Sequence, residues 1–270
     1  MVAATDNGAH ALVFIFLFLP VAPAAGHSVG PATRGVEMNL LAFDTSTERM
    51  SVALQRGALD TVWQHSGPGG AQTSTELIPA IEALMAQADL NYTDLDAIVF
   101  GSGPGSFTGL RTACSVAQGL AFGAGIAVLP IDTLLCLAEA ARFAYAPQQG
   151  NWRVLALLDA RMDELYAAGY ALDNGQWRQT SDYRLLRPED ALDTTADAIV
   201  GNVFAAYGAR LPVSSAARIE ALPDAAALLR LAPALLAAGG AVSPEQALPL
   251  YIRDKVAQTT LERAALKAAL

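Results

Sequence analysis

Residues 101–111 read Gly101-Ser102-Gly103-Pro104-Gly105-Ser106-Phe107-Thr108-Gly109-Leu110-Arg111, and they follow the apolar run 95–100. The apolar run predicts a strand, and the small residues of 108–122 predict a helix. Glycines allow close backbone approach, and a helix N-terminus presents free N–H groups. The segment therefore predicts a strand-to-helix turn, which either presents amides to a ligand or is only a tight connection.

Two well-known phosphate-binding loops are excluded at this turn. A Walker A loop needs a lysine directly after its last glycine, and the first lysine of this chain is Lys255. The dinucleotide-binding fingerprint also fails, because its third glycine position falls on Ser106 or Thr108. The loop therefore matches neither of these phosphate-binding motifs.

Composition predicts a folded protein with one large domain or two lobes. The 270 residues are 53% hydrophobic, and 17 basic residues stand against 26 acidic ones, which gives a net charge of −9. Because affinity for nucleic acid comes largely from neutralised phosphates, such a chain is a poor binder of RNA by itself. If RNA is involved, we expect a partner to supply the positive surface.

The cysteines and histidines limit the chemistry further. Cys114 and Cys136 lie in apolar surroundings, and we predict buried thiols in a reducing compartment rather than a disulfide. The three histidines, His10, His27 and His65, have no spacing typical of a metal site. We therefore expect no metal.

The N-terminal residues 1–37 are predicted to lie outside the fold. The apolar run 11–19 is followed by small residues, as in a secretory signal, but no lysine or arginine precedes it. The run is also shorter than the roughly 20 residues that a membrane span needs. We take Met38 as the natural start of a cytoplasmic protein with no membrane association, and a genuine signal is the alternative.

A strand, an aspartate, a turn and a second strand occur twice in this chain. The first copy is 40–55, with Asp44 at the turn, and the second is 154–170, with Asp159 at the turn. Such a repeat predicts a duplicated α/β fold whose two lobes bracket a cleft. We assign 38–150 to the first lobe, 151–246 to the second and 247–270 to a C-terminal tail.

Two predicted helices in the first lobe, about 75–88 and 108–122, carry distinctive stripes. The first helix has an apolar row, which is Leu77, Ile81, Leu84 and Met85. The second has one small stripe at Gly109, Ala113, Ala117 and Ala121, and another at Ser115, Gly119 and Gly123. Small residues let another helix approach closely. The partner of each stripe is either the neighbouring helix of this chain or a helix of another protein.

These segments together resemble the bacterial TsaB family, also called YeaZ. The resemblance rests on Leu41 to Thr47, the glycine loop 101–111, Asp159 to Met162 with Glu164 and Tyr166, and Pro249 to Arg253. It implies a duplicated two-lobed α/β fold of the actin, sugar-kinase and Hsp70 type. It also implies a non-catalytic subunit that activates a TsaD-type transferase, which forms N6-threonylcarbamoyladenosine beside the anticodon of tRNA.

The resemblance implies partners and sites as well. The partners are the TsaD-type subunit, a TsaE-type ATPase, a second copy when the protein is alone, and tRNA indirectly through the complex. The residues implied at the partner interface are Leu77, Ile81, Leu84, Met85, Gly109, Ala113, Ala117 and Ala121. The residues implied near a nucleotide are Asp44, Thr45, Ser46, Gly103, Gly105, Ser106, Thr108 and Arg111. Many relatives have a histidine before the first helix, but this chain has Ala71-Gln72-Thr73-Ser74, and we expect no cofactor.

Two enzyme classes remain as alternatives. A small-molecule kinase of this fold has a glycine after its first aspartate, where this chain has Thr45, and a glycine pair where it has Gly201-Asn202. A glycoprotease-like peptidase needs an activated nucleophile or a metal-bound water. His65 is the only histidine after Met38, and neither Ser106 nor Cys114 has an identifiable relay partner. We therefore expect a binding protein and not an enzyme.

Overall fold

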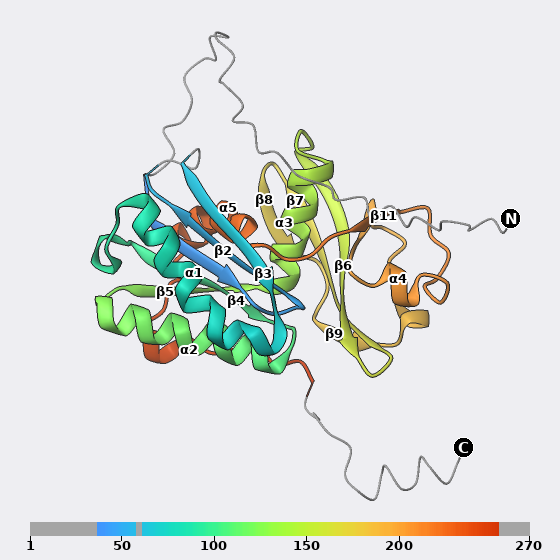
Figure 1. The fold of residues 1–270 in the computed structure, drawn as a ribbon. Coiled ribbons are helices and arrows are strands. Elements are labelled where there is room, and N and C mark those ends of the chain that lie inside the picture. Colours follow the sequence, from blue (N-terminus) through green and yellow to red (C-terminus); the bar gives the residue numbers. More distant parts are fainter. Residues whose placement is uncertain (1–36, 58–60, 254–270) are drawn as a thin grey trace, which may run out of the picture. The chain divides into compact units, whose positions relative to one another are not determined.

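The first lobe is built on a five-stranded sheet in the order β3-β2-β1-β4-β5 (Figure 1). The computed structural model describes residues 37–57 and 61–253. The strands of this sheet are β1 (Leu40–Asp44), β2 (Arg49–Gln55), β3 (Val62–Pro68), β4 (Ala97–Gly103) and β5 (Ala127–Asp132). β1 pairs antiparallel with β2 and parallel with β4, so the predicted first hairpin is confirmed.

The second sheet repeats this topology. Its order is β11-β10-β6-β7-β8, with β9 on β7. The strands are β6 (Asn151–Arg161), β7 (Glu164–Asp173), β8 (Gln176–Gln179), β9 (Arg184–Leu186), β10 (Ala198–Gly201) and β11 (Ala217–Glu220). Like β1, β6 pairs antiparallel with the strand after it and parallel with a later one. This correspondence confirms the predicted duplicated two-lobed α/β fold.

Helices cover both faces of the first sheet. α1 (Thr73–Ala88) and α2 (Phe107–Ala124) lie together on the face that contains the side chains of Leu41 and Phe43. α5 (Ala225–Ala237) packs on the opposite face against Leu40 and Ala42. Because successive side chains of a strand point to opposite faces, β1, which is apolar from Leu40 to Phe43, is buried on both sides. The short helices are α4 (Phe204–Tyr207), η1 (Gly70–Gln72), η2 (Tyr92–Asp94), η3 (Pro188–Asp190) and η4 (Pro244–Gln246).

α3 (Thr133–Tyr145) lies between the two sheets. Cys136 and Ala140 pack with the first sheet, whereas Leu134 and Leu137 pack with the second. A helix that is apolar on two sides is expected to be buried on both. α3 therefore joins the two lobes into one packed structure.

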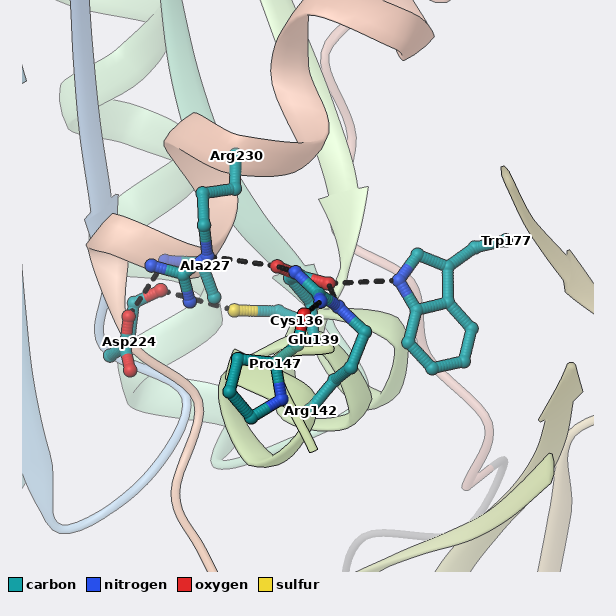
Figure 2. A network of polar contacts seen from close by, with 8 residues as sticks. All are labelled: Cys136, Glu139, Arg142, Pro147, Trp177, Asp224, Ala227 and Arg230. Carbon is teal, nitrogen blue, oxygen red and sulfur yellow. Dashed lines mark hydrogen bonds and ion pairs between the residues drawn. The ribbon is translucent and has the colours of Figure 1, made fainter. Parts of the chain in front are cut away.

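A buried polar network reinforces this junction (Figure 2). The Glu139 carboxylate of α3 accepts hydrogen bonds from Arg142, from Arg230 of α5 and from the indole N–H of Trp177 on β8. Burial raises the pKa of Glu139, but these donors outweigh burial and hold that pKa below its ordinary value. The network links three elements that are far apart in the sequence.

Several details differ from the sequence predictions. α1 begins at Thr73 rather than at 75. α5, which chain order places in the second lobe, packs mainly on strands of the first sheet. The predicted buried thiols are confirmed, since Cys114 and Cys136 are both free and buried.

Parts of the predicted organisation lie outside the described residues. These parts are the predicted extension up to residue 36 and the tail from residue 254 onward. Among the helices that the structure describes, none combines the length and the apolar character of a membrane span.

Candidate functional site

The glycine loop packs directly onto the first hairpin turn, which is formed by residues 44–48. The Ser106 N–H donates to the Ser46 carbonyl at 2.8 Å, and the Thr45 hydroxyl donates to the Gly109 carbonyl at 2.7 Å. A Cβ at Gly105 would lie 2.6 Å from the Ser46 carbonyl oxygen, and one at Gly109 would overlap the carbonyl oxygen of Thr45. These glycines therefore allow one loop of the protein to approach another.

Asp44 is sealed beneath this contact. Its carboxyl Oδ1 accepts hydrogen bonds from the Ser46 N–H at 2.9 Å and from the Ser46 hydroxyl at 2.7 Å. Its Oδ2 has no hydrogen-bond partner among the described residues, and a Cβ at Gly101 would overlap it. Burial raises the pKa of Asp44, and the hydrogen bonds from Ser46 oppose that rise.

A cleft of about 420 Å³ lies between the hairpin turns of the two lobes. From the first lobe it is lined by Ser46, Thr47, Glu48, Gly70 and Gly105 to Thr108. From the second lobe it is lined by Leu158 to Met162, Tyr166 and Asn202, and from the C-terminal segment by Arg253. The N-terminus of α2 thus faces the β6–β7 turn across the cleft.

The β6–β7 turn has an unusual backbone. Arg161, Met162 and Asp163 all have positive φ, at 61°, 55° and 66°. Each non-glycine residue in this region costs about 1–3 kcal/mol and persists only where its surroundings hold it. Asp159 holds the turn from within, since its Oδ1 accepts from the Arg161 N–H at 2.8 Å. Arg210 forms an ion pair with Asp163 from outside.

The last described residues, Ala247–Arg253, cross from the first lobe to this turn, and we call them the strap. Arg253 is buried and donates to the Glu164 carboxylate at 2.5 Å and to the Arg161 carbonyl at 3.3 Å. Tyr251 packs on Phe107 with ring centroids 5.2 Å apart. Nothing local in the motif Pro249 to Arg253 indicates a bond to Glu164, so the sequence alone does not predict this anchoring role.

Only half of the residues expected near a nucleotide line the cleft. Ser46, Gly105, Ser106 and Thr108 line it, whereas Asp44, Thr45 and Gly103 are buried elsewhere in the loop contact. Arg111 is directed to the strap and donates to the Tyr251 hydroxyl at 3.1 Å. Among the described residues, no group of three or more His, Cys, Asp or Glu side chains is placed to hold a metal ion.

The eight residues expected at a partner interface are all in the core. The residues that are buried in the first lobe are Leu77, Ile81, Leu84, Met85, Gly109, Ala113, Ala117 and Ala121. This placement corrects the choice of face, because the sheet needs small residues on α2 and an apolar row on α1 for close packing. The second small stripe, Ser115, Gly119 and Gly123, is exposed instead.

The exposed face of α2 has hollows on both sides. One hollow, of about 420 Å³, separates α2 from η4 and is lined by Ser115, Gln118, Gly119, Phe122, Pro244 and Glu245. The other, of about 310 Å³, is lined by Asn91, Tyr92, Thr93, Gly119, Leu120, Gly123 and Ala124. Phe122 lines the first hollow and is 72% exposed. Contiguous exposed apolar surface is typical of protein interaction sites.

A second carboxylate, which is partly buried, joins the lobes at the end of β5. Asp132 accepts a hydrogen bond from the Tyr170 hydroxyl of β7 and caps α3 through the Leu134 N–H at 2.9 Å. Burial raises the pKa of Asp132 to about 6, although its hydrogen bonds act in the opposite direction. Burial and the neighbouring Asp132 also raise the pKa of Tyr170.

Comparisons with known proteins agree with this fold. A family model described as "TsaD: tRNA N6-adenosine threonylcarbamoyltransferase" matches residues 69–260. The chain is 34% identical to the tRNA threonylcarbamoyladenosine biosynthesis protein TsaB of Haemophilus influenzae, over 81% of this chain and 95% of that protein. It is also 34% identical to TsaB of Escherichia coli, over 82% and 96% of the two chains. The solved structure of YeaZ from Pseudomonas aeruginosa superposes with a TM-score of 0.70 at 38% identity, over 80% of this chain and 100% of that one.

Proposed function

Because the chain belongs to the TsaB family of tRNA threonylcarbamoyladenosine biosynthesis proteins, we propose that it is the non-catalytic partner of a TsaD-type transferase. In this role it forms a heterodimer with the TsaD-type subunit and activates the formation of N6-threonylcarbamoyladenosine beside the anticodon of tRNA. A TsaE-type ATPase joins the pair, and the protein forms a homodimer when alone.

The sealed state of Asp44 is the observation that carries the non-catalytic part of the proposal. A kinase of this fold needs this carboxylate open to a metal ion and a phosphate, but here Gly101 and the docked glycine loop enclose it. The Ser106 amide, which a phosphate would need, already donates to the Ser46 carbonyl. Both features favour a structural role for the loop, which fixes the N-terminus of α2.

The exposed face of α1 and α2 is the surface that we assign to the partner. Ser115, Gly119 and Gly123 recur every four residues along α2, so a partner helix can approach its backbone closely. Phe122 on α2 and Ile78 on α1 add exposed apolar side chains. A surface of small residues with a few large apolar ones fits a helix-to-helix interface.

The charge of the chain favours an indirect role in tRNA binding. The formal net charge of −9 has the same sign as the phosphate backbone, so the chain as a whole gains little of the phosphate neutralisation on which nucleic-acid affinity depends. The positive surface for tRNA therefore belongs to the partner subunit.

Sedimentation with a purified TsaD-type subunit tests this proposal. The wild-type chain is expected to form a stable heterodimer. Gly119→Arg places a long charged side chain at an exposed position where a Cβ meets nothing within 4 Å, so the monomer should fold normally. A change at the centre of an interface costs about 2 kcal/mol or more, so the dissociation constant should rise by roughly 30-fold or more.

The matched control is Val213→Arg in the second lobe, where the side chain is 98% exposed and far from α2 in the sequence. This variant should bind as the wild type does. A wild-type chain that forms no heterodimer at low micromolar concentration, or equal affinity of the two variants, would contradict the proposed surface.

A further inference from the structure

The strap, Ala247–Arg253, is anchored at its first residue to the core of the first lobe. The Ala247 carbonyl accepts hydrogen bonds from the Gln118 amide at 2.8 Å and from the Cys114 thiol at 3.2 Å, and both donors belong to α2. Ala247 itself is fully buried. Any movement of α2 at this level therefore reaches the start of the strap.

The middle of the strap is bound to the glycine loop. The Leu250 N–H donates to the Ser102 carbonyl at 2.7 Å. The Leu250 carbonyl oxygen lies so close to Gly103 that a Cβ there would be 2.5 Å away. Gly103 has a φ of 121°, which side chains rarely adopt, so this contact requires glycine.

Tyr251 connects the strap to the first turns of α2. Its ring packs on Phe107, and the Arg111 guanidinium lies 5.8 Å from the centroids of both rings. The Arg111 Nε–H donates to the Tyr251 hydroxyl. Cation–π contacts of this kind are stronger where the groups are partly desolvated. Arg111 is exposed on α2, so this cluster lies at the edge of the surface assigned above to the partner.

The last residue of the strap holds the second lobe. Arg253 donates to Glu164 and to the Arg161 carbonyl, and its Nη1 lies 3.3 Å from the Met162 sulfur. These residues form or flank the β6–β7 turn, whose backbone is left-handed at three successive positions. Such a turn relaxes when a restraint on it is removed. Arg253 is therefore a positioning residue for one wall of the cleft.

We infer that the strap couples the outer surface at Arg111 and Tyr251 to the β6–β7 turn, so that a protein docked on α2 changes the conformation of the inter-lobe cleft. Only one residue, Ile252, separates the Tyr251 cluster from the Arg253 anchor, and hydrogen bonds hold the strap on both sides of it. The coupling is reciprocal, so a ligand or a substitution at the turn also changes the affinity for the partner. The part of this inference that concerns a docked protein rests on the proposed function, whereas the link between Tyr251 and the turn does not.

Hydrogen exchange of the full-length protein tests the link without any partner. Tyr251→Ala removes the contacts with Phe107 and Arg111 and leaves the groups that form the hydrogen bonds of the turn unchanged. If the strap links Tyr251 to the β6–β7 turn, amide hydrogen exchange in residues 159–166 should accelerate in this variant by roughly fivefold or more. This factor is the lower end of ordinary coupling between sites. Leu248→Ala is the matched control, because Leu248 lies on the same strap and is 67% exposed. It should leave the turn unchanged.

Two further variants keep the test decisive. Arg253→Met should accelerate exchange of the turn directly, and Arg253→Lys serves the same purpose if the methionine variant does not fold. Acceleration in the Arg253 variants but none in Tyr251→Ala would overturn the inference, because Arg253 would then act only locally.

The same measurement with a TsaD-type subunit separates the two proposals. Protection of 115–124 reports docking on α2, and a change in 159–166 that Arg253→Met abolishes reports the coupling. Protection of α2 with no change at the turn would overturn the coupling and leave the proposed function standing. If α2 is not protected at all, the proposed function fails, and the comparison of Tyr251→Ala with Leu248→Ala alone decides the coupling.

Discussion

The hairpin turns of the two lobes contain the same kind of hydrogen bond but lie in different environments. In each, an aspartate carboxylate accepts from the N–H two residues later, at 2.9 Å for Asp44 and at 2.8 Å for Asp159. The first turn is enclosed by the glycine loop, and Asp44 is completely buried. The second turn lines the cleft, where Arg161 pairs with the Asp159 carboxylate at 3.1 Å.

This difference shows how a duplicated scaffold diverges. The sheet topology and the aspartate-to-amide bond are common to both lobes, so they belong to the fold. What differs is the element that packs on the turn, which is the α2 N-terminus in the first lobe and the strap in the second. The two turns therefore differ in what packs around them more than in their own hydrogen bonding.

The largest expected effect comes from breaking the loop contact of the first turn. In Gly109→Ala, the new methyl group overlaps the carbonyl oxygen of Thr45, so the free energy of unfolding should fall by about 3 kcal/mol or more. In Gly119→Ala on the same helix, the new methyl group meets nothing within 4 Å, so the free energy of unfolding should rise by about 0.5–1 kcal/mol. Urea denaturation measures both, and equal shifts of the two midpoints would mean that the loops do not pack as described.

The anchor of the second turn should have the next largest effect. Arg253→Met leaves Glu164 without its buried partner, and we expect a loss of about 2 kcal/mol, less than for a fully buried pair because the Glu164 side chain is 37% exposed. Arg178→Met breaks a pair in which both side chains are more than half exposed, and it should cost at most about 0.5 kcal/mol. Thermal unfolding that ranks the two variants in the reverse order would show that Arg253 is not a structural anchor.

Two carboxylates between the lobes, Asp132 and Glu139, should change stability with pH in opposite directions. The pKa of Asp132 is raised to about 6, so its contribution to stability is present below about pH 4 and is lost as the pH rises through 6. The size of this loss is about 1–3 kcal/mol. The pKa of Glu139 is lowered, so its contribution is lost as the pH falls through its folded pKa.

Unfolding free energies between pH 3.5 and 7 check these signs. Asp132→Asn should make stability rise more steeply with pH, and Glu139→Gln should make it rise less steeply. The same slope in Asp132→Asn as in the wild type would show that Asp132 titrates normally in the folded protein.

The smallest expected difference in stability concerns the hydroxyl groups that donate hydrogen bonds to the two aspartates. Ser46→Ala removes a buried hydrogen bond at 2.7 Å from Asp44 and should cost about 1–2 kcal/mol. Tyr207→Phe removes a hydrogen bond at 3.2 Å from Asp159, where water can take its place, and should cost about 0.5 kcal/mol or less. Chemical denaturation of both variants gives the comparison, and equal losses would mean that the two carboxylates have similar surroundings.

The sequence was sufficient to predict the duplication and insufficient to predict which helix faces are free. An apolar strand that ends in aspartate is a local pattern, so Asp44 and Asp159 revealed the repeat. On α2, however, both the stripe of Ala113 and Ala117 and the stripe of Gly119 and Gly123 consist of small residues, and only the sheet beneath them decides which is buried. The bond between Glu164 and Arg253 joins residues 89 positions apart, and no periodicity predicts it.

Reconstituted threonylcarbamoyladenosine formation on tRNA tests most directly whether this chain acts as a non-catalytic partner. With a TsaD-type subunit and a TsaE-type ATPase, Asp44→Asn should support the wild-type rate within about twofold, because a sealed carboxylate does not take part in the reaction. Gly119→Arg should lower the rate by about tenfold or more at limiting protein concentration, because it prevents docking. An Asp44→Asn variant that still forms the heterodimer but no longer supports the modification would contradict the non-catalytic role.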